Sequence, residues 1–190
     1  FAEADFVFEG TYETQRVHTC YLEPRVCVVD MDRQDNVTIH VTTQHLFGTR
    51  EKLAFALGIP ESKVKVVKSP YIGGGFGGKL ELTSMEPVAA LLSKKSGRPV
   101  KVLMNRTDVF EGSGPTSGTW VKVKLGLKDG KISGVKAELA YEAGAYPGSP
   151  VGAGSMTMLA PYVIDNFQID GYDVVLNKPK VAAYRAPGSP

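Results

Sequence analysis

Apolar and polar positions alternate along much of the chain and predict β-strands, because a half-buried strand turns every second side chain to the core. The predicted strands cover residues 5–12, 26–30, 37–41, 64–67, 100–103, 120–127, 132–141 and 171–176. Polar residues 32–36 separate the second strand from the third and predict a hairpin. The sequence Lys-Asp-Gly-Lys at residues 128–131 predicts another compact hairpin turn.

Two segments show helical periodicity instead. Residues 48–58 predict a helix that Thr49 caps at its start and Gly58 ends. Residues 85–95 predict a second helix, which Gly97 ends. The apolar stripes consist of Leu53, Ala56 and Leu57 in the first helix and Val88, Leu91 and Leu92 in the second. Because helices and strands follow one another without a repeat, we expect an α+β fold of mixed sheets with packed helices.

Composition and charge exclude several classes of protein. The 190 residues are 43% hydrophobic and 22% charged, the balance of an ordinary soluble domain. The 22 Lys and Arg residues and 20 Asp and Glu residues alternate in sign and leave a net charge of only +2. We therefore expect no nucleic-acid partner and no anionic membrane surface. No apolar stretch approaches the roughly 20 residues that cross a bilayer, and a cytoplasmic location is the default expectation.

The cysteines and the ends of the sequence carry weaker information. Cys20 and Cys27 have neither the CxxC spacing nor the second pair of a zinc or redox motif, so we expect two reduced, buried thiols. The sequence begins without Met and stops directly after a glycine-rich turn. We interpret it as a piece of a longer protein.

Two glycine-rich segments are candidates for function. Residues 142–161 are rich in Gly, Ala and Ser, and they predict a long functional loop anchored by Met156, Met158 and Leu159. Residues 73–79 contain five glycines around one aromatic residue and end in a lysine, between a predicted strand and a predicted helix.

Residues 73–79 match two nucleotide-binding motifs incompletely. The dinucleotide fingerprint GxGxxG fits, but Arg98 lies near the position where an acidic residue is expected, about 20 residues further on. The phosphate-loop pattern GxxxxGK also fits, yet Leu80 stands where Ser or Thr would hold Mg²⁺. Consecutive glycines instead open several backbone N–H groups toward an anionic or oxo-bearing ligand, with Phe76 as a rigid wall. A plain tight turn needs only one or two glycines.

Four segments, taken together, resemble the molybdenum-cofactor subunit of the xanthine dehydrogenase and aldehyde oxidase family. They are His18-Thr19-Cys20-Tyr21-Leu22-Glu23-Pro24, Val41-Thr42-Thr43-Gln44, Gly73-Gly74-Gly75-Phe76-Gly77-Gly78-Lys79 and Ala183-Tyr184-Arg185-Ala186-Pro187-Gly188. They occur in the family's order and extend over nearly the whole chain. The resemblance implies that residues 1–190 are a fragment of the first molybdenum-cofactor-binding domain, without the family's N-terminal hammerhead domain and C-terminal catalytic segment.

The resemblance also implies roles for individual residues. The implied cofactor-binding residues are Gln44, Gly75, Phe76 and Gly77, and the implied substrate-binding residues are Leu80 and Arg185. Gln44 matches the family glutamine whose amide hydrogen-bonds an oxo ligand of molybdenum. Phe76 and Gly77 match loop residues whose backbone approaches the metal and the dithiolene end of the pterin. No residue of the chain is expected to bind the metal directly.

Three further positions carry expectations about the substrate and the cofactor. Leu80 stands where xanthine dehydrogenases place a substrate-binding glutamate and aldehyde oxidoreductases an apolar residue, which argues against purine hydroxylation. Arg185 matches an arginine that orients a carboxylate or polarises a carbonyl, although a surface arginine beside a turn is an even alternative. Glu23 is either a buried hydrogen-bond acceptor near the cofactor or merely exposed.

The family's reaction is the hydroxylation of an electron-poor carbon with water as oxygen source. The resemblance implies an aldehyde or an N-heterocyclic or aromatic small-molecule substrate. The required general-base glutamate lies in a later segment of the family, so we expect no catalytic residue within this chain and no activity from it alone. The implied cofactor is molybdopterin, with the cytosine dinucleotide as one form. Electrons would pass to 2Fe–2S clusters and FAD on partner subunits or domains, which join the rest of the large subunit as partners.

Two other functions compete with this interpretation. A non-catalytic scaffold relative would keep the fold signals and lose the ligand contacts, and the presence of Gln44, Phe76 and Arg185 favours the enzyme over it. The second alternative, an unrelated nucleotide-binding module, is supported by residues 73–79 alone. Micromolar binding of ATP or NAD would support that alternative.

Overall fold

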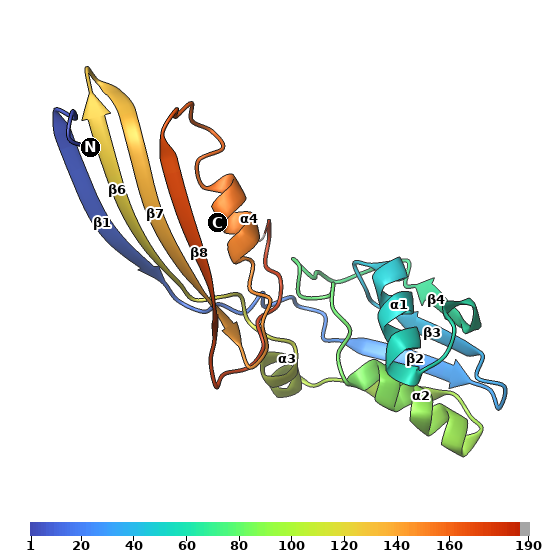
Figure 1. Ribbon diagram of the computed structural model, residues 1–190. Helices are drawn as coiled ribbons and strands as arrows, with labels where there is room; N and C mark the ends of the chain where they lie inside the picture. Colours follow the sequence, from blue (N-terminus) through green and yellow to red (C-terminus); the bar gives the residue numbers. More distant parts are fainter. Residues whose placement is uncertain (187–190) are drawn as a thin grey trace. The chain divides into compact units, whose positions relative to one another are not determined.

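The computed structural model describes residues 1–186 and divides the chain into two compact units. The central unit comprises Thr19–Gly114. The flanking unit combines Phe1–His18 with the segment that starts at Pro115. The mixed helices and strands of Figure 1 confirm the expected α+β class.

The central unit is a four-stranded mixed sheet with helices packed on it (Figure 1). Its strand order is β4-β3-β2-β5, in which β3 and β4 are parallel and the other pairs antiparallel. The elements are β2 (Val26–Met31), β3 (Val37–Val41), α1 (Leu46–Leu57), a 3₁₀ turn (Glu61–Lys63), β4 (Val64–Lys68), α2 (Met85–Ser96), β5 (Val100–Leu103) and α3 (Arg106–Gly112). The predicted hairpin of β2 and β3 is confirmed.

One apolar core lies between this sheet and the helices α1 and α2. The residues that form it are Cys27, Val29, Met31, Val37, Ile39, Val41, Leu53, Ala54, Val64, Met85, Ala89 and Ala90. The strands contribute alternate positions, as the sequence pattern predicts, and the helices contribute mostly small side chains that let them lie close to the sheet.

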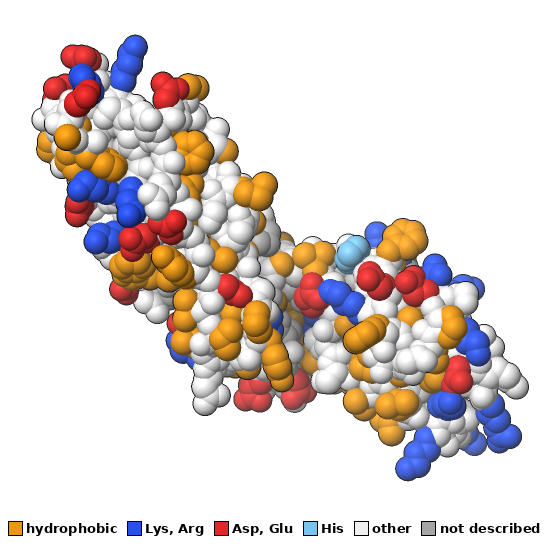
Figure 2. All heavy atoms as spheres, in the orientation of Figure 1, with side chains coloured by type: hydrophobic (Ala, Val, Ile, Leu, Met, Phe, Trp, Pro, Cys, Tyr) orange, Lys and Arg blue, Asp and Glu red, His pale blue; other side chains and the backbone are white. Residues whose placement is uncertain are grey.

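The structure differs from the prediction in where helix α1 begins and in which face of helix α2 packs on the sheet. Helix α1 begins three residues before Thr49, whose hydroxyl lies 2.9 Å from the Thr43 hydroxyl inside the unit, so the predicted cap is wrong. In α2 the predicted stripe of Val88, Leu91 and Leu92 does share one face, but that face is about half exposed. The sheet contacts the opposite face because its Ala and Ser side chains permit a closer approach. Hydrophobic side chains consequently remain on the surface (Figure 2).

The flanking unit is a second four-stranded sheet, of order β1-β6-β7-β8. Its strands are β1 (Phe6–Thr14), β6 (Thr119–Lys128), β7 (Lys131–Gly144) and β8 (Phe167–Val175). β1, β6 and β7 are antiparallel neighbours, whereas β7 and β8 are parallel. The predicted turn between β6 and β7 is confirmed, and its central residues Asp129 and Gly130 both have positive φ.

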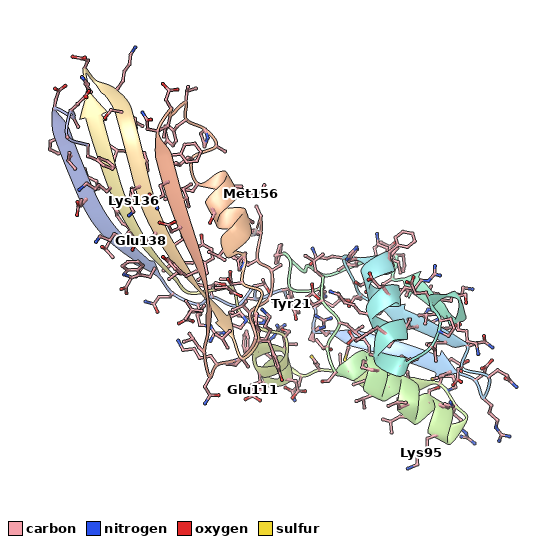
Figure 3. The ribbon with its side chains drawn as sticks, in the orientation of Figure 1. Tyr21, Lys95, Glu111, Lys136, Glu138 and Met156 are labelled. Carbon is pink, nitrogen blue, oxygen red and sulfur yellow. The ribbon has the colours of Figure 1, made fainter. Side chains whose placement is uncertain are left out.

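A short helix, α4 (Val151–Thr157), lies against β7 and β8 (Figure 1). The sequence pattern predicted a loop throughout residues 142–161, and this part of the prediction is wrong. Small residues at this point serve close packing: a Cβ added at Gly154 would lie 2.6 Å from the Tyr141 hydroxyl. Met156 is 82% exposed and points away from the sheet (Figure 3), so it is not the apolar anchor that we expected.

The two cysteines are reduced, but their burial differs. Cys27 is buried in the core of the central unit, as expected. Cys20 is exposed, contrary to expectation, in a backbone conformation with φ of 48°. Among the helices of residues 1–186, none has the length and apolar character needed to cross a membrane.

Candidate cofactor-binding site

The glycine loop, residues 73–79, runs between β4 and α2 in the central unit. Gly74, Phe76 and Gly77 all have positive φ, at 89°, 51° and 101°. The loop closes on itself through hydrogen bonds from Gly78 N–H to Gly75 O (2.7 Å) and from Leu80 N–H to Gly77 O (3.2 Å). A non-glycine residue with positive φ is strained, and such a backbone conformation persists only where the surrounding structure holds it. Phe76 is 42% exposed.

The side-chain amide of Gln44 lies against this loop. Its Oε1 atom accepts hydrogen bonds from the backbone N–H of Gly77 (2.9 Å) and of Lys79 (3.2 Å). Both neighbours are donors, so the oxygen must face the loop and the Nε2 group must point away from it. Within residues 1–186, Nε2 donates to no protein acceptor. Gln44 therefore presents two N–H donors outward from a fixed carbonyl.

Gly75 allows this close approach of Gln44. A Cβ built on Gly75 would lie 2.8 Å from Cδ of Gln44 and nearer still to Oε1. Real Cβ atoms essentially never come so close to another heavy atom. A larger residue at position 75 would therefore displace the carboxamide of Gln44.

Charged side chains inside the unit hold the glycine loop from one side. Lys79 is fully buried, and its Nζ lies 2.6 Å from Oε2 of Glu23 and 4.9 Å from the centroid of the Tyr21 ring. Burial lowers the pKa of the Lys79 ammonium below its usual value, and the hydrogen bond to Glu23 opposes that shift. Arg25, 4% exposed, donates to Gly78 O (2.8 Å) and pairs with the buried carboxylate of Glu86 (3.2 Å).

This arrangement differs from that of a phosphate-binding loop. In a phosphate-binding loop the lysine faces the ligand and a helix begins directly after it. Here the Lys79 ammonium faces Glu23 inside the unit, and α2 begins only at Met85. The geometry argues against the nucleotide-binding alternative.

The structure places the predicted site residues in two groups. Gln44, Gly75, Phe76 and Gly77 come together as expected, and the half-buried Leu80 follows them directly in the same unit. Arg185 belongs to the flanking unit, where it is exposed with its guanidinium 6.0 Å from the centroid of the Tyr184 ring. The end of the fourth resembling segment, Pro187 and Gly188, falls outside the described residues.

Glu23 is a partly buried hydrogen-bond acceptor beside the glycine loop. Its side chain is 30% exposed, and it accepts hydrogen bonds from Lys79 Nζ (2.6 Å) and from the Gly73 N–H (2.9 Å). Sequence reasoning missed the burial of Lys79 and the contact of Arg25 with the loop. Residue type alone gave no signal for them, since lysines and arginines are seldom buried.

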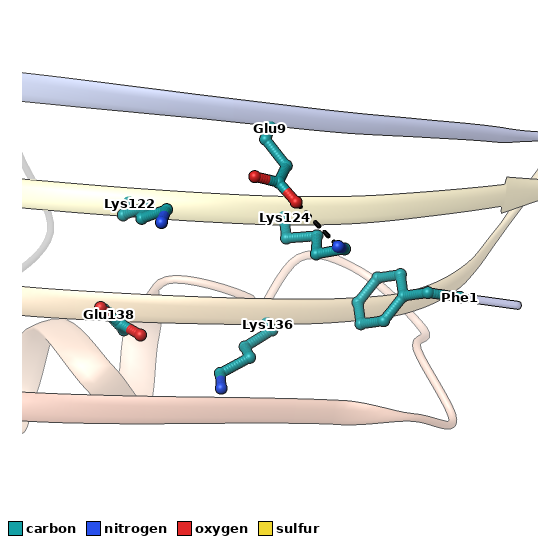
Figure 4. Close-up of a pocket in the computed structure, with 6 residues that line it drawn as sticks. All are labelled: Phe1, Glu9, Lys122, Lys124, Lys136 and Glu138. Atoms are coloured by element: carbon teal, nitrogen blue, oxygen red, sulfur yellow. Dashed lines mark ion pairs between the residues drawn. The ribbon is translucent and has the colours of Figure 1, made fainter.

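The flanking unit has a separate charged cavity on one face of its sheet (Figure 4). It has a volume of about 320 Å³ and is lined by Phe1, Glu9, Lys122, Lys124, Lys136 and Glu138. Lys136 and Glu138 project from the same face of β7 (Figure 3). Lys124 pairs with Glu9 at 2.7 Å and lies opposite Lys136 in the strand register. None of the predicted site residues lines this cavity.

The residues of the glycine loop suit an anionic or oxo-bearing ligand that is bound through its oxygen atoms. Gln44 offers outward N–H donors, and within the described residues the N–H groups of Gly74 and Gly75 donate to no protein acceptor. Glycine side chains leave room for close approach, and Phe76 supplies an apolar wall. Among residues 1–186, no three His, Cys, Asp or Glu side chains are grouped so as to hold a metal ion. A neutral, donor-rich loop of this kind suits a ligand that is held through backbone and amide groups.

Comparison with known proteins assigns the family. The chain belongs to the molybdopterin cofactor-binding domain family, which matches residues 1–190, and so to the xanthine dehydrogenase and aldehyde oxidase group of oxidoreductases. It is 32% identical to the nicotinate dehydrogenase large molybdopterin subunit of Eubacterium barkeri, over all of this chain and 45% of that subunit. It is 34% identical to a probable xanthine dehydrogenase subunit from Bacillus subtilis (strain 168), over 99% of this chain and 26% of that protein.

A solved structure supports the fold. The aldehyde oxidoreductase of Desulfovibrio desulfuricans ATCC 27774 superimposes with a TM-score of 0.88 at 27% identity, covering 96% of this chain and 20% of that enzyme. The resemblance found in the sequence is thereby confirmed. The chain spans less than half the length of these relatives.

Proposed function

We propose that this chain forms part of the molybdopterin site of a molybdenum hydroxylase, in which Gln44 and the glycine loop hold the cofactor. The single observation that supports it most is the geometry of Gln44. The loop fixes the amide oxygen through two N–H donors, and the outward Nε2 group is left to donate to a ligand oxygen. A preorganised neutral donor of this kind stabilises negative charge without reorganisation during the reaction.

The other predicted residues have complementary roles in this proposal. Gly75 and Gly77 give close access to the loop backbone, and Phe76 forms the apolar wall beside it. Leu80 would contact an apolar part of the substrate, and Arg185 would orient a carboxylate or carbonyl. The bound cofactor would supply the two-electron redox chemistry, while this chain's own residues bind and orient it and supply the polar contacts.

We further propose the activity of the whole protein. It would oxidise an aldehyde or an N-heterocyclic or aromatic substrate with water as oxygen source, using a general-base glutamate from a segment that residues 1–190 do not contain. The names of the relatives, nicotinate dehydrogenase and aldehyde oxidoreductase, agree with both kinds of substrate. The cofactor would be molybdopterin, with the cytosine dinucleotide as one form, and electrons would leave through 2Fe–2S clusters and FAD on partner subunits or domains.

The first test is the molybdenum and pterin content of the complete protein, co-expressed with its redox subunits in a host supplied with molybdate. Near-stoichiometric metal and pterin are expected. Absence of both, in a host that loads a control enzyme, would contradict the proposal and favour the scaffold alternative.

Two substitutions at Gln44 distinguish the role of its amide oxygen, which contacts the loop, from that of its outward N–H donors. Gln44→Glu keeps an oxygen for the N–H groups of Gly77 and Lys79 but removes the outward donor. We expect kcat to fall about 10²- to 10³-fold, the usual cost of losing one preorganised donor, with the fold retained. Gln44→Ala removes both contacts and should be at least as slow. Gln34→Ala, in the exposed turn between β2 and β3, is the matched control, and unchanged turnover of Gln44→Glu would refute the assigned role.

A further inference from the structure

The buried ammonium group of Lys79, in the glycine loop, is paired with a carboxylate. Lys79 is fully buried, and a charged ammonium in such a place is costly unless it is paired. Its Nζ donates to Oε2 of Glu23 at 2.6 Å and lies over the Tyr21 ring at 4.9 Å from the centroid. The long side chain therefore runs from the loop across to the segment that precedes β2.

The same Glu23 oxygen also contacts the start of the loop. Oε2 accepts the Gly73 N–H at 2.9 Å, and the backbone N–H of Glu23 donates to Gly73 O at 3.0 Å. One carboxylate oxygen thus joins both ends of the glycine loop. Gly73 is tied by its backbone and Lys79 by its side chain.

The backbone of Lys79 in turn holds Gln44. The Lys79 N–H donates to Gln44 Oε1 at 3.2 Å, and the Gln44 N–H donates to Lys79 O at 3.0 Å. The Thr43 hydroxyl also donates to Lys79 O, at 3.2 Å. Any displacement of residue 79 would move the oxygen end of the Gln44 amide, and with it the direction of the outward Nε2 donors.

We propose that Glu23 and Lys79 are positioning residues, whose ion pair closes the glycine loop and thereby fixes the direction in which the Gln44 amide donates. This inference rests on the proposed function, because that function gives the Nε2 donors their ligand. Neither residue contacts the cofactor in this scheme. Each acts through the loop backbone and Gln44.

The energetics of buried ion pairs agree with a positioning role. Replacing such a pair by well-packed apolar residues is often neutral or stabilising, because desolvation offsets most of the attraction. The presence of this pair, in which Lys79 is buried and Glu23 is 30% exposed, is therefore weak evidence that it serves to stabilise the fold. What it adds is a defined distance and direction between the two ends of a loop made mostly of glycine, which has wide backbone freedom.

The test uses two variants of the complete protein. Lys79→Met keeps the length of the side chain and removes the ammonium, whereas Glu23→Gln keeps an acceptor oxygen and removes the charge. Lys94→Met is the matched control, because Lys94 forms an ion pair with Asp35 in the same unit, away from the loop residues. The readouts are hydrogen exchange of residues 73–80, molybdenum and pterin content, and separate kcat and KM values.

For Lys79→Met we expect exchange of the amides at positions 73, 77 and 79 to become at least about 10-fold faster, measured also in protein without cofactor. We expect kcat to fall about 10- to 100-fold, as is usual when a group that orients a ligand-binding side chain is removed. KM should change far less than kcat, because the pair does not touch the substrate. Glu23→Gln should fall between Lys79→Met and the wild type, and Lys94→Met should match the wild type.

The outcomes distinguish this inference from the proposed function. Unchanged exchange in Lys79→Met overturns the positioning role, as does a change in KM that matches the change in kcat. If Lys79→Met does not fold, unchanged exchange and kcat in Glu23→Gln overturn it instead. A wild-type protein without molybdenum and pterin contradicts the proposed function, whereas the exchange rates of the cofactor-free protein still decide whether the pair holds Gln44.

Discussion

The contact between Gly75 and Gln44 gives a prediction whose size follows from the structure. In Gly75→Ala the added methyl carbon would lie 2.8 Å from Cδ of Gln44, whereas ordinary contacts begin at 3.4 Å. The carboxamide must therefore retreat by about 0.6 Å or more, and its oxygen lies nearer still to the methyl group. The two hydrogen bonds of Oε1, at 2.9 and 3.2 Å, would be stretched or lost. Gly75 does not have positive φ, so backbone strain adds nothing to this cost.

Two lost hydrogen bonds at about 0.5–1.5 kcal/mol each lower the local free energy of opening by about 1–3 kcal/mol. Exchange of the Gly77 and Lys79 amides should then become about 5- to 150-fold faster. Hydrogen exchange of the complete protein, read by mass spectrometry, measures this directly. Gly112→Ala is the control in the same unit, because its methyl group would meet only Met104 at an ordinary 3.6 Å.

A double-mutant cycle isolates the contact. In Gln44→Ala the side chain that clashes is gone, so adding Gly75→Ala should accelerate exchange little further. If the effects of the two substitutions on exchange were simply additive, the clash with Gln44 would not be the cause, and the reasoning would be refuted.

Two further predictions concern buried groups of the central unit. Arg25→Met leaves the Glu86 carboxylate, only 1% exposed, without its cation, and should lower the free energy of unfolding by about 3–5 kcal/mol. Urea denaturation measures this, and a loss below about 1 kcal/mol would contradict the pairing. Burial raises the pKa of the Cys27 thiol to about 12, so that it stays protonated well above neutral pH. Iodoacetamide at pH 8 should alkylate the exposed Cys20 and spare Cys27 in the folded protein, and equal labelling would contradict this.

The strands could be predicted from the sequence because their pattern reports a local property. The pattern of apolar and polar positions predicted each strand found within residues 1–186, with β3 and β5 correct to the residue, although β8 begins four residues before its predicted start. The helix ends at Gly58 and Gly97 were also correct, since both residues adopt the left-handed conformation that glycine favours. Side-chain packing was harder to predict from the sequence. In α2 the larger apolar residues predicted the face that packs on the sheet, yet the sheet contacts the face that carries small residues. The distance between helix and sheet depends on the packing of the whole unit, which the sequence of one helix does not report.

For the candidate site, too, local features could be predicted from the sequence and long-range side-chain contacts could not. Its position and its partner Gln44 followed from motifs, and the structure brings them together. The burial of Lys79 did not follow, because a lysine after a glycine run is equally consistent with a phosphate ligand. Only the partner decides between the two, and Glu23 lies 56 residues away in sequence. Pairings between distant residues of this kind are what a single sequence conceals.

The choice of glutamine at position 44 can be argued from these contacts. A side chain at this place must accept hydrogen bonds from two backbone N–H groups on one side and donate on the other. Glutamate can only accept when ionised, and lysine or arginine can only donate. An amide does both from one planar group, so fixing its oxygen also fixes the direction of its donors. In the proposed scheme the loop, its glycine at position 75 and the Glu23–Lys79 ion pair act together. They set the orientation of a single neutral donor.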